Sequence, residues 1–289
     1  AADSIESPSK IRPFRQAQVV VRSTPSRDAQ PGSFPLLASQ YGWWAYSAGI
    51  QHMNEQLQKT SFWEEAWIRH IEQYLQTSPR TGLWLKSRFP VMGWRVLEIA
   101  GGSCRDSRYL AEQGVDAIGS DFDQKTLDYL NQRFPESPLK LAREDASALS
   151  FPDKDVDLSL HNGFWVLFSD NAKITALLRE QARVTRHVLV ALVHNAENPR
   201  IVAAFANKAR SDPLYDIRFF HRCEMAALVK TADLGDHRVR LEKFGGPIDR
   251  LFSLPAGLGL VAKMIVPRLY RFLPWRHVER IALVIELRP

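Results

Sequence analysis

The stretch Val96-Leu-Glu-Ile-Ala-Gly-Gly-Ser-Cys-Arg-Asp106 decides the fold of this chain. It is a short apolar strand that contains one acid, then two glycines, and then the start of a helical pattern. A buried strand that ends in a glycine-containing turn and opens a helix is typical of an open α/β sheet. In such sheets ligands bind at the carboxyl ends of the strands, where backbone N–H groups of the turn face them. The turn is therefore the first candidate ligand-binding site. The alternative is that its glycines only allow a tight connection between the strand and the helix.

Apolar runs of strand length alternate with amphipathic helical stretches downstream of this turn. The alternation predicts a doubly wound α/β fold with a mostly parallel sheet and helices on both faces. The expected strands are 95–99, 117–121, 139–142, 156–160, 187–193, 237–244 and 280–287. The expected helices are 106–113, 124–133, 172–184 and 224–231.

The upstream sequence divides into two segments of different composition. Residues 1–35 are rich in proline and predict a loosely ordered N-terminal arm. Residues 36–90 are aromatic and helical, with an interruption expected at Pro79 and Gly82. Tyr41, Trp44 and Tyr46 in this segment predict a lid over a ligand site or, alternatively, packing against a sheet edge. Residues 91–289 form the third expected segment, the main domain, with an insertion over 245–278.

Composition and charge narrow the functional classes. The chain is 45% hydrophobic, enough for a sizeable core, and carries a net charge of +6. The positive electrostatic potential of such a protein attracts nucleic acid, anionic membranes and acidic substrates. The acidic residues between Glu98 and Asp170 argue against a groove for nucleic acid in that part of the chain. The two cysteines, Cys104 and Cys223, lack metal-ligand spacing, which predicts free thiols, no metal site and a cytoplasmic location.

Two other classes of glycine-rich nucleotide-binding motif are excluded, because the residues after the first strand do not have the required spacing. A dinucleotide fingerprint that starts at Gly101 or Gly102 requires further glycines where the chain has Ser103 to Ser107. A P-loop requires Gly-Lys-Ser/Thr, which does not follow the strand.

The turn resembles the first motif of class I S-adenosylmethionine-dependent methyltransferases, which has an acid followed by alternating glycines. Glu98 takes the acid position and Gly102 the central glycine; Ala100 and Cys104 stand where the family often has glycine, and Gly101 is an extra one. A side chain at Cys104 is expected to disfavour positive φ and to narrow the backbone approach. The resemblance implies S-adenosylmethionine as cofactor and a seven-stranded sheet with an antiparallel last strand.

Two later motifs strengthen the resemblance. Asp121, followed by Phe122, stands at the end of the second strand, where the family's acid accepts both ribose hydroxyls; its alternative role is a helix cap. Asp145 and Ala146 match the pair that contacts adenine, although Asp145 alone also suits a turn. Asn162 follows the fourth strand, where the family lines the methionine moiety and the substrate. The resemblance covers about residues 95–195.

Methyl transfer from S-adenosylmethionine, which the resemblance implies, needs few catalytic side chains because the methyl group is already activated. A general base is required only for a hydroxyl or protonated amine, and His161 and His194, at the carboxyl ends of the fourth and fifth strands, are the candidates. Either histidine can instead simply cap its strand.

The insertion mixes Leu, Phe, Trp and Arg. Over 250–278 this mixture is consistent with peripheral contact with anionic lipid, with a cap on an apolar acceptor, or with an ordinary helical insertion that contributes to a homo-oligomer.

The sequence as a whole predicts methyl transfer to O or N of a small-molecule or glycan-type acceptor. An RNA methyltransferase is the first alternative, but the chain has no recognisable RNA-binding module. After the fourth strand it has His161-Asn-Gly-Phe164 in place of the Asn/Asp-Pro-Pro-aromatic signature that many base N-methyltransferases carry. A non-catalytic protein with a degenerate methyltransferase fold, which binds a partner, is the second alternative.

Overall fold

The computed structural model describes residues 69–288. Its elements, in chain order, are α3 (Arg80–Arg88), β1 (Arg95–Glu98), α4 (Arg105–Glu112), β2 (Asp116–Asp121), α5 (Gln124–Arg133), β3 (Lys140–Arg143), β4 (Val156–Asn162), η1 (Trp165–Leu167), α6 (Asn171–Val184), β5 (Thr185–His194), α7 (Pro199–Ala209), η2 (Pro213–Tyr215), α8 (Arg222–Ala232), β6 (His237–Phe244), η3 (Pro247–Ser253), α9 (Ala256–Leu269), η4 (Tyr270–Phe272), η5 (Trp275–His277) and β7 (Arg280–Leu287).

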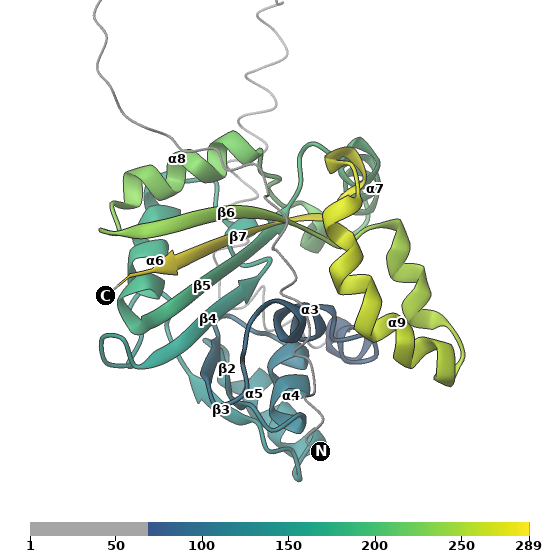
Figure 1. The fold of residues 1–289 in the computed structure, drawn as a ribbon, viewed down its shortest axis with the longest axis horizontal. Helices are drawn as coiled ribbons and strands as arrows, with labels where there is room; N and C mark the ends of the chain where they lie inside the picture. Colours follow the sequence, from purple (N-terminus) through teal and green to yellow (C-terminus); the bar gives the residue numbers. More distant parts are fainter. Residues whose placement is uncertain (1–68, 289) are drawn as a thin grey trace, which may run out of the picture. The chain divides into compact units, whose positions relative to one another are not determined.

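The strands form one seven-stranded sheet of order β3-β2-β1-β4-β5-β7-β6 (Figure 1). Strands β1 to β5 are parallel, and β7 runs antiparallel to both β5 and β6. The strand order reverses between β1 and β4, so their carboxyl ends form the switch point at which open α/β sheets bind ligands. The predicted fold class is confirmed.

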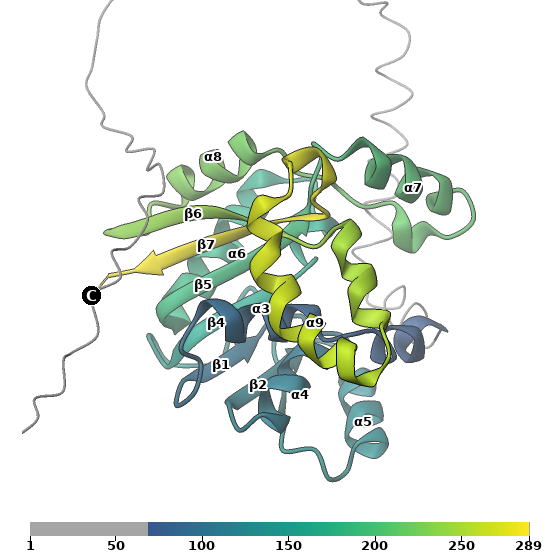
Figure 2. The ribbon, with the colours of Figure 1, turned by 45° about the vertical axis from the view of Figure 1, so that its right-hand side comes forward.

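The central strand β5 shows why the sheet needs helices on both faces. Side chains alternate along a strand, and Val188, Val190 and Leu192 pack with α3, α4 and α9. Leu189, Ala191 and Val193 instead pack with α6 and α8. The two helical layers are visible in Figures 1 and 2. Because both faces are covered, β5 reads as a continuous apolar run in the sequence.

The interruption expected at Pro79 is present, because residues 76–79 separate a helix that ends at Leu75 from α3, whereas the interruption expected at Gly82 is wrong. Helix α3 begins at Arg80 directly after Pro79, a residue that fits a helix start because it lacks an N–H. Gly82 lies inside α3, where an added Cβ would be 2.7 Å from a ring carbon of Tyr109 and 2.9 Å from the Asp106 carbonyl oxygen. Gly82 therefore allows α3 to approach α4 closely.

Helix α7 was absent from the sequence prediction, although its start carries a recognisable signal. The side chain of Asn198 accepts a hydrogen bond from the Ile201 N–H, and Pro199 occupies the first helical position. The helix has no fully buried residue. Among the described residues, no helix is long and apolar enough to cross a membrane.

Candidate active site

The turn after β1 alternates between ordinary and left-handed backbone. Ala100, Gly102 and Cys104 have φ angles of 49°, 53° and 43°. These are the three positions at which the resembled motif has glycine, so the chain keeps the backbone shape even where the glycines are replaced. Left-handed conformations cost non-glycine residues on the order of 1 kcal/mol or more, so the surrounding structure must hold Ala100 and Cys104 in place.

Cys104 does not narrow the ligand side of the turn as expected. Its side chain is fully buried and lies under the turn, packed against Gly119 of the neighbouring strand β2. A Cβ added at Gly119 would be 2.8 Å from Sγ of Cys104. Gly119 thus provides the room that the cysteine side chain occupies.

Glu98 supports the turn from the core side. Its carboxylate accepts a hydrogen bond from the Ser107 N–H at 3.0 Å, which links the end of β1 to the first turn of α4. Burial, and then the nearby charge of Asp106, raises the pKa of Glu98 to about 7. Glu98, Gly101 and Gly102 do not line the cavity described below, so a direct cofactor contact by these three residues stays a prediction.

Asp121 joins the turn to the end of β2 and faces the cavity. Its two carboxylate oxygens accept hydrogen bonds from the N–H groups of Gly102 at 2.8 Å and Asp123 at 3.1 Å. Burial raises the pKa of Asp121, whereas these backbone hydrogen bonds lower it. Each carboxylate oxygen has a second lone pair, so Asp121 can still accept from two neighbouring hydroxyls. Asp121 does not cap α5, because that role belongs to Asp123.

The residues predicted to contact adenine follow β2 and β3. Asp145 is exposed, and its carboxylate accepts from both the N–H and the hydroxyl of Ser147, at 2.8 and 2.7 Å. These hydrogen bonds lower the pKa of Asp145. The Phe122 ring is 47% exposed and lines the same cavity as Asp145 and Ala146. Together they offer one acceptor and apolar surface, which suit a planar heterocycle.

A cavity of about 510 Å³ opens at the switch point. Ala100, Asp121, Phe122, Asp145, Ala146 and Asn162 all line it. The other wall comes from more distant segments and includes Phe164, Phe168, His194, Phe205, Tyr215 and Arg280. None of the lining residues lies in 245–278, so this geometry gives no support to the insertion as a cap on the acceptor.

The two candidate bases lie in different surroundings. His161 is 1% exposed and does not line the cavity; its ring packs 4.6 Å from that of Trp165. Neither of its ring nitrogens has a hydrogen-bond partner among the described residues, and burial lowers its pKa to about 3. The neutral ring of His161 lies inside the core and does not face the cavity.

His194 lines the cavity, and its ring packs against those of Phe205 and Phe219, with centroid distances of 4.7 and 5.5 Å. Burial, and then the positive charge of Arg280, lowers the pKa of His194 well below its usual value. The ring is therefore neutral at neutral pH.

Arg280 is a cavity residue that the sequence reasoning missed. It donates to the side-chain oxygen of Asn162, whose amide group donates to Thr81 at 2.9 Å. The Nε atom of Arg280 is buried and lies 3.5 Å from Oε1 of Glu279 in an ion pair, but it makes no hydrogen bond in the described part of the chain. A usable signal existed: the last strand is antiparallel, so its first residue lies at the edge where the parallel strands end.

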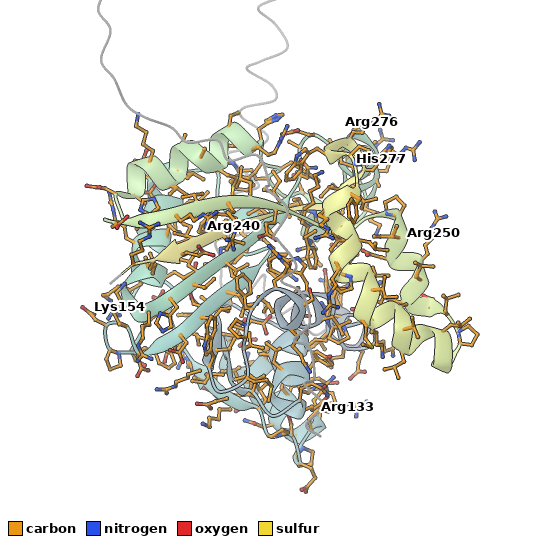
Figure 3. All side chains as sticks on the ribbon, viewed as in Figure 1. Arg133, Lys154, Arg240, Arg250, Arg276 and His277 are labelled. Carbon is orange, nitrogen blue, oxygen red and sulfur yellow. The ribbon has the colours of Figure 1, made fainter. Side chains whose placement is uncertain are left out.

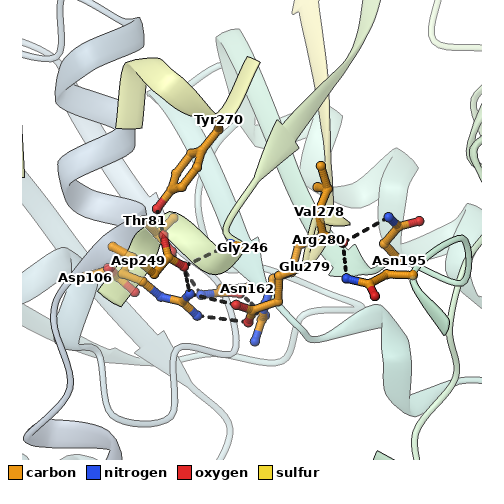
Figure 4. A network of polar contacts seen from close by, with 12 residues as sticks. Thr81, Asp106, Asn162, Asn195, Gly246, Asp249, Tyr270, Val278, Glu279 and Arg280 are labelled. Atoms are coloured by element: carbon orange, nitrogen blue, oxygen red, sulfur yellow. Dashed lines mark hydrogen bonds and ion pairs between the residues drawn. The ribbon is translucent and has the colours of Figure 1, made fainter. Parts of the chain in front are cut away.

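A partly buried ion network holds the C-terminal segments against this edge (Figure 4). Arg80 pairs with both carboxylate oxygens of Glu279, at 2.7 and 2.9 Å, and also with Asp249. Asp249 accepts from the Tyr270 hydroxyl at 2.7 Å and the Gly246 N–H at 3.1 Å. Burial raises the pKa of Glu279, but the hydrogen bonds and charge of Arg80 hold it below its usual value. The network fixes Glu279 and hence the backbone that presents Arg280.

The predicted lid residues Tyr41, Trp44 and Tyr46 lie outside the described residues. Within the described part, no group of three or more His, Cys, Asp or Glu side chains could hold a metal ion.

Comparisons with known proteins agree with this geometry. Residues 96–187 match a family model described as a methyltransferase domain. The fold resembles a SAM-dependent methyltransferase from Archaeoglobus fulgidus, with 19% identity, a TM-score of 0.52 and coverage of 75% of this chain and 97% of the other. It also resembles an S-adenosylmethionine-dependent methyltransferase from Mesorhizobium loti, with 14% identity, a TM-score of 0.50 and coverage of 74% and 100%. The sequence has no match among curated proteins.

The sheet order, the cavity at its switch point and the domain match define a class I methyltransferase fold. Residues 96–187 match a methyltransferase domain, and the chain has the Rossmann-like fold of the S-adenosylmethionine-dependent methyltransferases that it resembles. The residues present fit the cofactor: Asp121 has free lone pairs on the cavity wall, and an aromatic ring and a second acceptor lie beside it.

Proposed function

We propose that this protein transfers a methyl group to an oxygen or nitrogen atom of a small-molecule or glycan-type acceptor that binds beside His194 and Arg280. The observation that carries the proposal is that the cofactor-side residues and these two side chains line one cavity. Its volume, about 510 Å³, is in the range of small-molecule sites. When bound, S-adenosylmethionine supplies a methyl group that is already activated.

The wall opposite the cofactor residues suits an acceptor with an apolar, planar part. Phe164 and Phe168 lie edge to face, with ring centroids 5.1 Å apart, and Phe205 and Tyr215 are 5.7 Å apart. Such surfaces bind rings and exclude water. Positioning of this kind is worth roughly 7–11 kcal/mol in favourable cases, so it can supply much of the rate acceleration.

Arg280 and His194 supply the polar contacts of that wall. Arg280 hydrogen-bonds to the neutral amide of Asn162 and forms a longer ion pair with Glu279, whose carboxylate oxygens are hydrogen-bonded to Arg80. A carboxylate or phosphate on the acceptor would complete the hydrogen bonding of the Arg280 guanidinium. His194, neutral beside this cation, is the group that would take a proton from a hydroxyl or ammonium acceptor.

The test is to follow S-adenosylhomocysteine formation by the purified protein with a panel of phenols, aromatic carboxylic acids and monosaccharides. We expect turnover with at least one class and a marked loss in His194→Gln and in Arg280→Gln. The matched controls are His187→Gln and Arg186→Gln, because both side chains are half exposed on the surface. Methylation of RNA with no small-molecule turnover would overturn the acceptor class. Failure of the folded protein to bind the cofactor would favour the non-catalytic alternative.

A further inference from the structure

The outer surface of the C-terminal helical segment is unusually apolar. Of the eleven large hydrophobic side chains that are exposed among the described residues, eight lie between positions 251 and 272. We call them the α9 face: Leu251, Leu254, Leu258, Leu260, Val261, Met264, Ile265 and Phe272. Their exposed fractions run from 39% to 69%. A contiguous apolar surface of this kind usually marks an interaction site.

The fold does not require this face, because the opposite side of the segment provides the packing. Ala262, Val266 and Tyr270 follow one another at helical spacing and are buried against α3 and the sheet. The Tyr270 hydroxyl is also held by Asp249. The segment is therefore attached through its inner side, and the apolar residues on its outer side are available to something else.

The charge of the segment points to the kind of partner. Residues 250–278 contain five basic residues, Arg250, Lys263, Arg268, Arg271 and Arg276, and no Asp or Glu. All five are exposed, and Figure 3 shows Arg250 and Arg276 extending away from the ribbon. The flanking acids, Asp249 and Glu279, are both engaged by Arg80. Nothing within the segment neutralises its positive charge.

Basic and apolar side chains are interleaved on this surface. The Arg271 guanidinium lies 4.6 Å from the centre of the Phe272 ring, and Lys263 precedes Met264 directly. Helices that lie in the headgroup region of a bilayer combine an inserted apolar surface with Lys and Arg that reach anionic headgroups. A symmetric contact between two copies would instead bring the same basic residues against one another.

We propose that the α9 face is a peripheral binding surface for anionic lipid bilayers. With 14 residues, α9 is too short to span a bilayer and would lie along its surface. The apolar side chains would enter the acyl boundary, while the five cations contact lipid headgroups. This inference does not depend on the methyl acceptor.

The experiment is vesicle flotation of the full chain, with vesicles of phosphatidylcholine alone and vesicles in which one third is phosphatidylglycerol. We expect binding to the anionic vesicles, weaker binding to the neutral ones, and release as the salt concentration rises. Leu260→Gln combined with Met264→Gln should weaken binding by about tenfold or more, because two inserted side chains are lost. Lys263→Gln should weaken it by about fivefold.

The chain offers matched controls for both changes. Met92 is 59% exposed and Met264 61%, so Met92→Gln makes the same chemical change away from the face. Lys230→Gln on α8 is the control for Lys263→Gln. Both controls should bind vesicles like the unaltered protein, and an unchanged thermal unfolding midpoint would verify that each variant is folded.

Three results would overturn the proposal. The first is absence of binding to anionic vesicles, which is also the result expected if another segment of the chain covers the face. The second is equal loss of binding in Met92→Gln and in the α9 variants. The third is a dimer in light scattering that the Leu260 and Met264 changes dissociate while no vesicle is bound, since the face would then join two copies.

Discussion

Gly119 and Cys104 are predicted to be energetically coupled, because the Cys104 side chain fills the space in which a side chain at position 119 would lie. In Gly119→Ala the new Cβ would lie 2.8 Å from Sγ and 2.9 Å from Cβ of Cys104, and 3.1 Å from the Ser107 hydroxyl. Cys104 is fully buried and cannot swing out. Overpacking of this kind costs about 1–3 kcal/mol, and close contacts with two buried side chains argue for the upper half of that range.

Cys104→Gly should alter stability much less than Gly119→Ala does. It relieves a left-handed non-glycine residue, worth about 1 kcal/mol, and it removes a small buried side chain of comparable value. In the Cys104→Gly background the new methyl at position 119 has room, so Gly119→Ala should cost under about 1 kcal/mol there. The predicted coupling energy is therefore about 1–2 kcal/mol.

The assay is urea unfolding of the four proteins in this double-mutant cycle. Gly257→Ala is the control, since an added Cβ at Gly257 meets nothing within 4 Å. Equal destabilisation by Gly119→Ala in both backgrounds would refute the reasoning, because it would mean that the cysteine does not occupy the space beside β2.

Three further predictions concern the site. Asp121→Asn should weaken S-adenosylhomocysteine binding by roughly 100-fold in calorimetry, since an amide can no longer accept from two backbone N–H groups and from ribose; Asp116→Asn, at the exposed start of the same strand, should bind normally, and an Asp121→Asn protein with unaltered affinity would show that the ribose site is elsewhere. His194→Gln should lower kcat by about 100-fold or more while cofactor affinity is kept, and, because the pKa of His194 is depressed, the rate should hold as the pH falls through the usual histidine range; a rate that falls with a midpoint in that range would count against His194 as the base. For Glu98, a pKa raised from 4.5 to about 7 means that the folded protein keeps a proton that the unfolded chain loses, so this group's contribution to stability is lost as the pH rises through that window. Glu98→Gln should therefore gain on the order of 3 kcal/mol relative to the unaltered protein across the window in urea unfolding, and a difference that is flat with pH would contradict the assignment.

Local sequence pattern was sufficient for the parallel half of the sheet. Each strand there is a buried apolar run followed by a turn and a helix, so strand, turn and candidate ligand position could be predicted from adjacent residues. Asp121, Asp145 and Asn162 were found in this way, and all three line the cavity.

The opposite wall of the cavity could not be predicted in the same manner. Arg280 reaches the cavity only because β7 is antiparallel, and Phe205 only because α7 lies beside it, so both depend on tertiary arrangement. His161 shows the converse limit. It directly precedes Asn162, but successive side chains of a strand point to opposite sides, and only Asn162 lines the cavity.

The role of Cys104 also required the structure. From the sequence it was expected to narrow the ligand side of the turn, but its side chain lies on the core side, in space left by Gly119. The compensating residue is in the next strand, so inspection of the turn alone could not reveal it.

The most direct test of the central claim is isothermal titration calorimetry of the purified chain with S-adenosylmethionine, S-adenosylhomocysteine and NADH. A class I cofactor site at the switch point predicts micromolar binding of the first two, one molecule per chain, and no binding of NADH. Absence of binding by a folded protein, or preference for NADH, would contradict it.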